Sequence, residues 1–321
     1  MEPAYPSSGP ERDKWILAQR PARETLDPRR PYAFLVEQEC SAVKEVVPVA
    51  TLFLTNRECP WRCVMCDLWR NTLAETLPAG AIPEQIDYAL AHLPPARQIK
   101  LYNSGSFFDR NAIPLEDYPA IATKVNSFER TIVESHPSLL KQGCLQFRDL
   151  LSNQLEVAMG LETVHPETLD KLNKRMTLTQ FSAAADYLQH NAIDLRVFIL
   201  VQPPFMKAQE ALYWAERSLE FAFDCGATAA TLIPTRGGNG AMEVLTQLNE
   251  FTPPRLDLVE SAALYGLNLR RGRVFVDLWD LRTTSPGCEV CYSSRIARVE
   301  QMNLQQCALE PIHCAQCGGS R

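Results

Sequence analysis

The sequence alternates apolar, β-branched runs with amphipathic segments from about residue 46 onward. This alternation restricts the possible folds more than any other feature, because it is typical of βα units built around a parallel sheet. The expected strands are mostly apolar throughout, as strands covered on both faces should be, and they occupy residues 46–55, 98–103, 131–134, 155–161, 195–201 and 229–234. Helices with three- and four-residue apolar spacing are expected at 82–93, 115–128, 137–151, 166–191 with a break near Thr177, and 207–225.

Six consecutive units predict an α/β fold, a partial (β/α)6 TIM-like barrel of parallel strands, in a domain that spans residues 46–284. A further apolar stretch at 273–278 is a candidate edge strand. Right-handed crossovers place the strand-to-helix loops on one face, so functional residues are expected at the carboxyl ends of the strands. Residues 1–45 are expected to be an N-terminal extension, flexible in part because its start, MEPAYPSSGP, has no apolar run.

The composition excludes several classes of protein. No uncharged apolar run reaches the length of a membrane span, and the start lacks the pattern of a signal peptide, so we expect a cytoplasmic protein without a membrane partner. The formal net charge of -6 argues against the basic surface of an indiscriminate nucleic-acid binder. Two groups of arginines are either solvated surface residues or rows of cations that bind the phosphates of a nucleic acid. They are Arg20, Arg23, Arg29 and Arg30, and Arg270, Arg271 and Arg273.

The chain has 11 cysteines, and metal ligation explains them better than disulfides because the cytosol keeps thiols reduced. Cys59, Cys63 and Cys66 form a C-x3-C-x2-C run directly after the first expected strand of the barrel. Three thiolates hold one face of a cubane iron-sulfur cluster and leave one iron open, whereas zinc ligands more often come as paired C-x2-C knuckles. An open iron has room for the amino and carboxylate groups of S-adenosylmethionine.

This motif resembles the defining motif of the radical S-adenosylmethionine superfamily, and the resemblance covers about residues 46–236. It implies a [4Fe-4S] cluster on the three cysteines and an enzyme that reductively cleaves S-adenosylmethionine. The resulting 5′-deoxyadenosyl radical would abstract hydrogen from a substrate, and a reductant protein such as flavodoxin or ferredoxin would supply the electron. Met65 stands where the superfamily usually has an aromatic residue near the adenine.

Further cofactor-binding residues follow from the same resemblance. The superfamily's Gly-Gly-Glu-like turn, which takes the methionyl amine, is replaced here by Asn103, Ser104, Gly105 and Ser106, without a carboxylate. Glu134 resembles the third-strand acid of methylthiotransferases and of the elongator acetyltransferase subunit, and Glu162 lies in that subgroup's fourth-strand region. Short stretches at 103–109, 160–162 and 202–205 are similar to the radical subunit of archaeosine synthase, which makes a modified tRNA nucleoside, and hence tRNA, a candidate substrate.

Two C-x2-C knuckles near the C-terminus indicate a second metal site in a small Cys-rich module at residues 285–321. Cys288, Cys291, Cys314 and Cys317 suit structural zinc and equally suit a second iron-sulfur cluster, although the paired spacing resembles a zinc ribbon. Arg295 and Arg298 lie inside the module. The module is expected either to take part in substrate recognition or to attach the C-terminus to the barrel.

Two other functions remain open on the sequence. One is a sulfur-inserting, methylthiotransferase-like enzyme in which the C-terminal cysteines hold a second cluster. The other is a non-enzymatic iron-sulfur or zinc subunit that only binds RNA. No catalytic acid or base stands out in the sequence.

Overall fold

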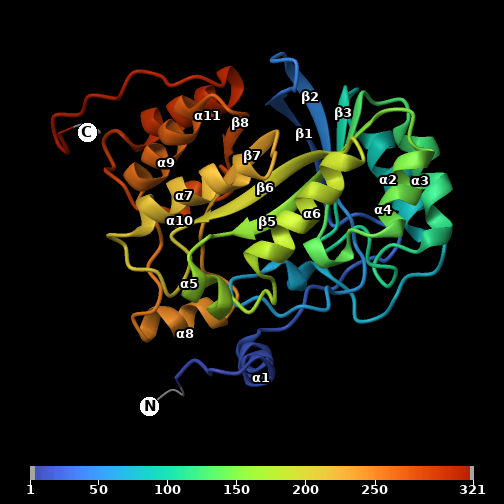
Figure 1. Ribbon diagram of the computed structural model, residues 1–321, viewed down its shortest axis with the longest axis horizontal. Coiled ribbons are helices and arrows are strands. Elements are labelled where there is room, and N and C mark those ends of the chain that lie inside the picture. The colour runs from blue at the N-terminus through green and yellow to red at the C-terminus, as the bar shows by residue number, and fades with distance from the viewer. Residues whose placement is uncertain (1–3, 319–321) are drawn as a thin grey trace.

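An eight-stranded sheet whose strands follow one another in chain order lies at the centre of the protein (Figure 1). The computed structural model describes residues 4–318. Strands β2 to β8 are parallel, and β1 runs antiparallel to β2. The strands are β1 (Ala33–Cys40), β2 (Val46–Phe53), β3 (Gln98–Tyr102), β4 (Arg130–Glu134), β5 (Gln154–Glu162), β6 (Asp194–Val201), β7 (Ala229–Pro234) and β8 (Arg273–Val276). This mixed α/β half-barrel confirms the partial barrel predicted from the alternation, and β8 is the edge strand that the sequence left as a candidate.

The helices connect the strands and cover the outer face of the sheet (Figure 1). They are α1 (Gly9–Gln19), α2 (Ala81–His92), α3 (Tyr118–Val125), α4 (Gln142–Leu150), α5 (Pro166–Lys171), α6 (Leu178–His190), α7 (Ala211–Asp224), α8 (Ala241–Gln247), α9 (Leu256–Leu269), α10 (Leu281–Thr284) and α11 (Tyr292–Gln305). Short 3-10 helices add η1 (Leu68–Asn71), η2 (Leu115–Asp117) and η3 (Pro137–Leu139). A capping box between Thr177 and Gln180 begins α6 and confirms the expected break there. No helix within residues 4–318 combines the length and the apolar character that a membrane span requires.

Strand β1 is not among the strands expected from the sequence. Glu37 and Glu39 interrupt its apolar residues, and both turn toward the barrel interior. There Glu39 contacts Arg196 at 2.6 Å and Lys100 at 2.5 Å. Because these cations come from β6 and β3, only the tertiary structure reveals that Glu39 can be buried in this strand, whereas the Glu37 side chain stays 43% exposed.

A buried network of charges fills the end of the barrel where the parallel strands begin. The fully buried carboxylate of Glu156 accepts hydrogen bonds from Arg196 at 2.6 Å, Arg273 at 2.9 Å and Arg130 at 3.1 Å. Burial works against ionisation of Glu156, but the three arginines outweigh it and lower its pKa to about 2. Arg273 also donates to the Cys40 carbonyl at 3.3 Å, which brings β1 and β8 together at this end.

The N-terminal extension is more ordered than its composition suggests. Residues 1–3 of the expected flexible start lie outside the described residues, but the Tyr5 hydroxyl donates to the Lys171 carbonyl at 2.8 Å. Trp15 and Ile16 on α1 are buried in a small apolar cluster with Val64 and Leu172. The extension therefore packs across the loop after β2 and beside α8 (Figure 1).

The basic groups noted in the sequence do not form stripes of free cations. Six of the seven arginines pair with carboxylates, in the pairs Arg20–Glu58, Arg23–Glu58, Arg29–Glu84, Arg30–Asp27, Arg271–Asp224 and Arg273–Glu156. Arg295 and Arg298 are likewise buried against Glu260 on α9. These two side chains hold α11 to the barrel, so they are not available to bind a substrate.

Candidate functional site

The loop after β2 carries Cys59, Cys63 and Cys66 and is held from several sides. The Asn239 amide donates to the carbonyls of Val64 at 2.8 Å and Cys66 at 3.0 Å. The Asn173 amide donates to the Arg62 carbonyl at 2.7 Å. Because the carbonyls lie on both sides of Cys63 in sequence, these bonds fix the course of the backbone between the cysteines.

An ion-pair cluster fixes the start of the same loop. Glu58 precedes Cys59 and pairs with Arg20 at 2.7 Å, with Arg62 at 3.2 Å and with Arg23. Arg20 comes from the N-terminal extension and Arg62 from the loop itself. The extension thereby contributes directly to the position of the cysteines.

Burial raises the pKa of each of the three thiols to about 12, and the charge of Lys174 opposes this rise at Cys59 and Cys63. The thiols are therefore neutral at physiological pH unless a metal binds. A metal that binds here must displace the protons, as is usual for thiolate ligands.

The turn after β3 lies directly against the cysteine loop. A side chain at Gly105 would place its Cβ 3.3 Å from Cβ of Cys59, so glycine permits this close approach. The adjoining Ser104 has a φ of 53°, in the left-handed region. The Asn103 side chain is fully buried, and within residues 4–318 neither its amide nitrogen nor its amide oxygen has a hydrogen-bond partner. Such an amide beside the half-buried cysteine loop fits a polar ligand that the protein alone does not supply.

Glu134 at the end of β4 organises this turn. One of its carboxylate oxygens accepts the backbone N–H of Asn103 at 2.6 Å and of Gly105 at 3.3 Å. Burial raises the pKa of Glu134, and these backbone hydrogen bonds oppose the rise. The Ser106 hydroxyl accepts the backbone N–H of His136 at 2.8 Å, so the loops after β3 and β4 are tied together.

Glu162 at the end of β5 forms a buried ion pair with Lys174, which follows α5. Glu162 has a φ of 66° and lies at an irregularity in the pairing of β5 with β6. Non-glycine residues in this region cost about 1–3 kcal/mol and concentrate at functional sites. A Cβ at Gly160 would lie 2.2 Å from both the Glu162 carboxylate and the Lys174 ammonium nitrogen, so Gly160 makes room for the pair.

The Gly160→Ala variant is expected to lose about 1–3 kcal/mol of unfolding free energy, because the new methyl group separates a buried ion pair. Gly143→Ala is a matched control: its Cβ would meet no atom closer than 3.7 Å, and glycine within a helix costs about 0.5–1 kcal/mol relative to alanine. Urea unfolding of both variants measures the difference. Equal stabilities would contradict the role given to Gly160.

His136 stacks on Trp61 of the cysteine loop, with ring centroids 3.8 Å apart and planes 13° from parallel. Its Nε2 contacts the Lys174 carbonyl at 3.1 Å. Burial lowers the pKa of His136 to about 3, and the nearby Lys174 charge adds to this effect.

Stability is expected to fall as the pH drops below about 6.5, because His136 then takes up a proton only in the unfolded chain. The slope from this one residue is about 1.4 kcal/mol per pH unit, down to the folded pKa of about 3. Urea unfolding at pH 7 and pH 5 measures it. A His136→Gln variant should lose that part of the pH dependence, and an unchanged slope would count against this assignment.

The four C-terminal cysteines converge on one point. Their sulfur atoms all lie within 4.8 Å of one another, although the two knuckles are far apart in the sequence. The Cys288 and Cys314 sulfurs are 3.9 Å apart, and those of Cys291 and Cys317 are 3.7 Å apart. This arrangement of four sulfur atoms fits one bound metal at the C-terminal site that the sequence predicts.

Comparison with known proteins agrees with the sequence motifs. No family model matches the chain. An uncharacterized protein of Methanocaldococcus jannaschii is 24% identical over 250 residues, which cover 73% of this chain and 68% of that protein. Archaeosine synthase subunit beta of Methanosarcina acetivorans is 24% identical over 220 residues, which cover 64% of this chain and 63% of the subunit. The chain thus spans less than two thirds of that subunit's length.

Among solved structures, a radical S-adenosylmethionine methyltransferase from Kitasatospora setae aligns with a TM-score of 0.47 at 15% identity, over 62% of this chain and 39% of that one. The chain is thus similar in sequence to archaeosine synthase subunit beta, which agrees with the resemblance indicated by the short motifs.

The residues expected in a site of this radical S-adenosylmethionine type lie in the loops after β2 and β3 or at the ends of β4 and β5. They are Cys59, Cys63, Cys66, Met65, Asn103, Ser104, Gly105, Ser106, Glu134 and Glu162. Met65 is half-buried against the apolar cluster beneath α1. Ser104 contacts the Tyr32 hydroxyl at 2.9 Å.

The sequence gives no role to Tyr32, Lys174, Asn173 or Asn239, although residues 165–174 resemble the same subgroup's fourth-strand region. Tyr32, Asn173 and Asn239 come from segments distant in sequence from the residues they contact, so spacing gives no signal for them. The only local signal for Asn173 and Lys174 is their position directly after Leu172, the residue that caps the end of α5.

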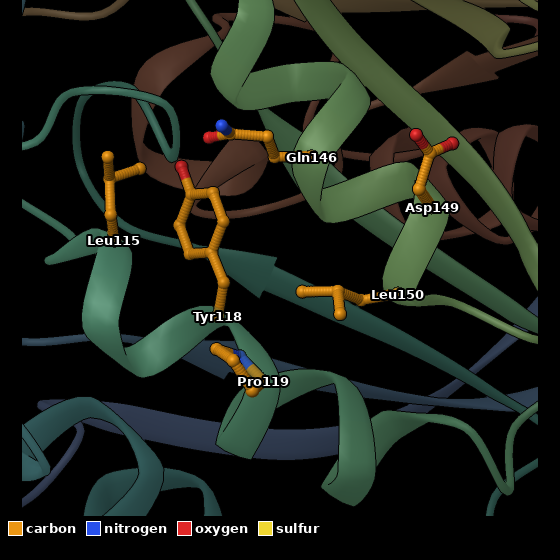
Figure 2. Close-up of a pocket in the computed structure, with 6 residues that line it drawn as sticks. All are labelled: Leu115, Tyr118, Pro119, Gln146, Asp149 and Leu150. Atoms are coloured by element: carbon orange, nitrogen blue, oxygen red, sulfur yellow. The ribbon is translucent and has the colours of Figure 1, made fainter.

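A pocket of about 410 Å³ lies elsewhere, on the outer helices (Figure 2). Its lining comes from η2, α3 and α4 and includes none of the cysteines or strand-end residues described above. The lining residues are Leu115, Tyr118, Pro119, Gln146, Asp149 and Leu150.

Proposed function

We propose that this chain is a radical S-adenosylmethionine enzyme with a [4Fe-4S] cluster on Cys59, Cys63 and Cys66. The observation that carries the proposal is the three-cysteine loop packed at Cys59 against Gly105, next to the Asn103 amide, which has no hydrogen-bond partner among the described residues. Three thiolates would leave one iron of a cubane open, and the Asn103 amide would be available to a polar ligand of the site.

Held by Cys59, Cys63 and Cys66, a [4Fe-4S] cluster would supply one-electron reduction of S-adenosylmethionine, with a flavodoxin- or ferredoxin-type protein as the electron source. Cleavage of the C5′–S bond would then give methionine and a radical able to take a hydrogen atom from the substrate. The protein's residues hold and orient the cofactor. Asn103 and the turn that Glu134 organises present backbone and amide groups to the cofactor. Lys174, paired with Glu162, supplies a buried positive charge beside Cys59 and Cys63.

The substrate we propose is a modified tRNA nucleoside. The support is the similarity to archaeosine synthase subunit beta, together with the short motifs at 103–109, 160–162 and 202–205. The cytoplasmic location that the sequence leads us to expect is part of the same proposal.

At the C-terminal site we propose zinc. A tetrahedral zinc with bonds of about 2.3 Å to sulfur separates its thiolates by about 3.8 Å, and the observed separations are 3.9 Å and 3.7 Å. The thiolates of a cubane bind different iron atoms and therefore lie farther apart. This geometry argues against the sulfur-inserting alternative, which needs a second cluster there.

Metal analysis of the anaerobically reconstituted chain is expected to give about four irons and one zinc per chain. About eight irons and no zinc would instead favour two clusters and the sulfur-inserting enzyme. A Cys314→Ser variant serves as the matched control, because it should lose the zinc and keep the four irons.

The direct test of the proposal is release of 5′-deoxyadenosine. The reconstituted full chain, given dithionite and S-adenosylmethionine without oxygen, is expected to form it. No release from a chain that carries its four irons would contradict the enzyme and favour an RNA-binding subunit without catalysis.

A further inference from the structure

The stretch of chain that follows α5 lies against the cysteine loop and carries a buried lysine. The Leu172 carbonyl accepts the backbone N–H of Val64 at 3.0 Å, and the Asn173 amide donates to the Arg62 carbonyl at 2.7 Å. These two backbone groups belong to the residues on either side of the middle cysteine of the motif. Lys174 is the next residue along this stretch, so its side chain starts close to that cysteine.

Lys174 is held as a charged group. Its side chain is 9% exposed and pairs with the Glu162 carboxylate, whose side chain is 10% exposed. Burial alone would lower the pKa of Lys174, but the charges of Glu162 and of the Cys63 thiolate outweigh burial and raise it. The amine is therefore protonated at neutral pH, and solvent ions screen the pair only weakly.

The positive end of this ion pair dominates at the cysteines. The charge of Lys174 acts on Cys59 and Cys63, and at Cys63 it acts more strongly than the charge of Glu162. In a buried site with little water, a unit charge has a larger effect on its neighbours than it has at the surface. An iron-sulfur cluster on these cysteines would therefore lie in a net positive field.

We propose that Lys174 and Glu162 set the reduction potential of the cluster held by Cys59, Cys63 and Cys66. Reduction adds one negative charge to the cluster, and the potentials of such clusters depend on the charge around them. The Lys174 ammonium stabilises the reduced cluster and raises its potential, and the Glu162 carboxylate offsets part of that rise. The pair balances ease of reduction by the donor against the reducing power that cleavage of S-adenosylmethionine needs. This inference rests on the proposed function and concerns its first step, the arrival of the electron.

Redox titration of the reconstituted full chain without S-adenosylmethionine measures the potential, with electron paramagnetic resonance reporting the reduced cluster. Lys174→Met is expected to lower the ratio of reduced to oxidised cluster about tenfold at a given solution potential, which is about 59 mV for one electron. Glu162→Gln is expected to shift the potential the opposite way, because it removes the opposing charge. Lys174→Arg keeps the positive charge and should stay close to the unaltered chain.

Lys124→Met is the matched control. Lys124 lies on α3 and pairs with Asp87, so this variant changes the net charge by the same amount on the outer helices. Its potential should equal that of the unaltered chain. A shift as large as that of Lys174→Met would show that net charge alone moves the potential, and the inference would fail.

Two further results would overturn the inference. One is an unchanged potential in Lys174→Met and Glu162→Gln when both carry four irons. The other is a shift in the same direction in both variants, because loosening of the site would let solvent reach the cluster in either case. If Lys174→Met does not hold the cluster, the directions in Glu162→Gln and Lys174→Arg decide. Absence of a four-iron cluster from the unaltered chain contradicts the proposed function instead, so the two failures are distinguishable.

Discussion

The Cys63→Ala variant is expected to keep the barrel but to lose the [4Fe-4S] cluster and, with it, all release of 5′-deoxyadenosine. Cys63 lies between the other two ligands of the motif, in a stretch of loop held by hydrogen bonds to the Val64 and Cys66 carbonyls. These bonds come from Asn239 and do not involve the thiol. Removal of one sulfur therefore leaves the loop in place but leaves two thiols, which are too few to retain the cluster while keeping one iron open.

Iron content, visible absorbance and product formation are measured together on the reconstituted protein. Cys225→Ala is the matched control, because Cys225 is also half-buried and its thiol lies 3.5 Å from the Ser182 hydroxyl, far along the chain from the motif. It should keep four irons and full product formation. If Cys63→Ala retained its iron and its product, the cluster assignment would be wrong.

The Glu156→Gln variant is expected to lose about 3–5 kcal/mol of unfolding free energy, because three buried arginines then face a neutral side chain. Glutamine keeps the size of the side chain, so the loss of unfolding free energy measures the effect of the missing charge and not that of a cavity. At a typical stability of about 5–15 kcal/mol, such a loss leaves a marginal protein.

Glu129→Gln is the control for this comparison. Glu129 pairs with Arg97 at 2.6 Å, but its side chain is 51% exposed, and an exposed pair is worth about 0–1 kcal/mol. Urea unfolding of both variants at neutral pH gives the two losses. A loss in Glu156→Gln as small as that in Glu129→Gln would show that the arginines reach solvent or other anions when the carboxylate is removed.

The two predictions concern opposite ends of one barrel. The end where the strands begin is stabilised by a neutralised network, in which each buried charge has a partner. The carboxyl ends instead carry residues in the left-handed region, such as Ser104 and Glu162, and the Asn103 amide, whose two polar atoms have no hydrogen-bond partner within the described part of the chain. Stability is thus concentrated at one end and binding capacity at the other, as in barrels of this kind generally.

The sequence by itself determined the order of strands from β2 to β7, the helices between them and the place of the cysteine motif. These features are local: strands and helices follow from the periodicity of apolar residues, and a loop directly after a strand lies at its carboxyl end whatever the rest of the chain does. The spacing of Cys59, Cys63 and Cys66 is likewise fixed by covalent connectivity. The C-x2-C knuckles were recognisable for the same reason.

Only the tertiary structure decided how distant residues combine, because burial and pairing depend on which strands become neighbours. It made β1 a strand by placing Lys100 and Arg196 against its acids, and it neutralised arginines that looked available in the sequence. It brought the two knuckles to within bonding reach of one ion. It also set Asn173 and Asn239 against the cysteine loop, contacts between distant segments that no spacing in the sequence predicts.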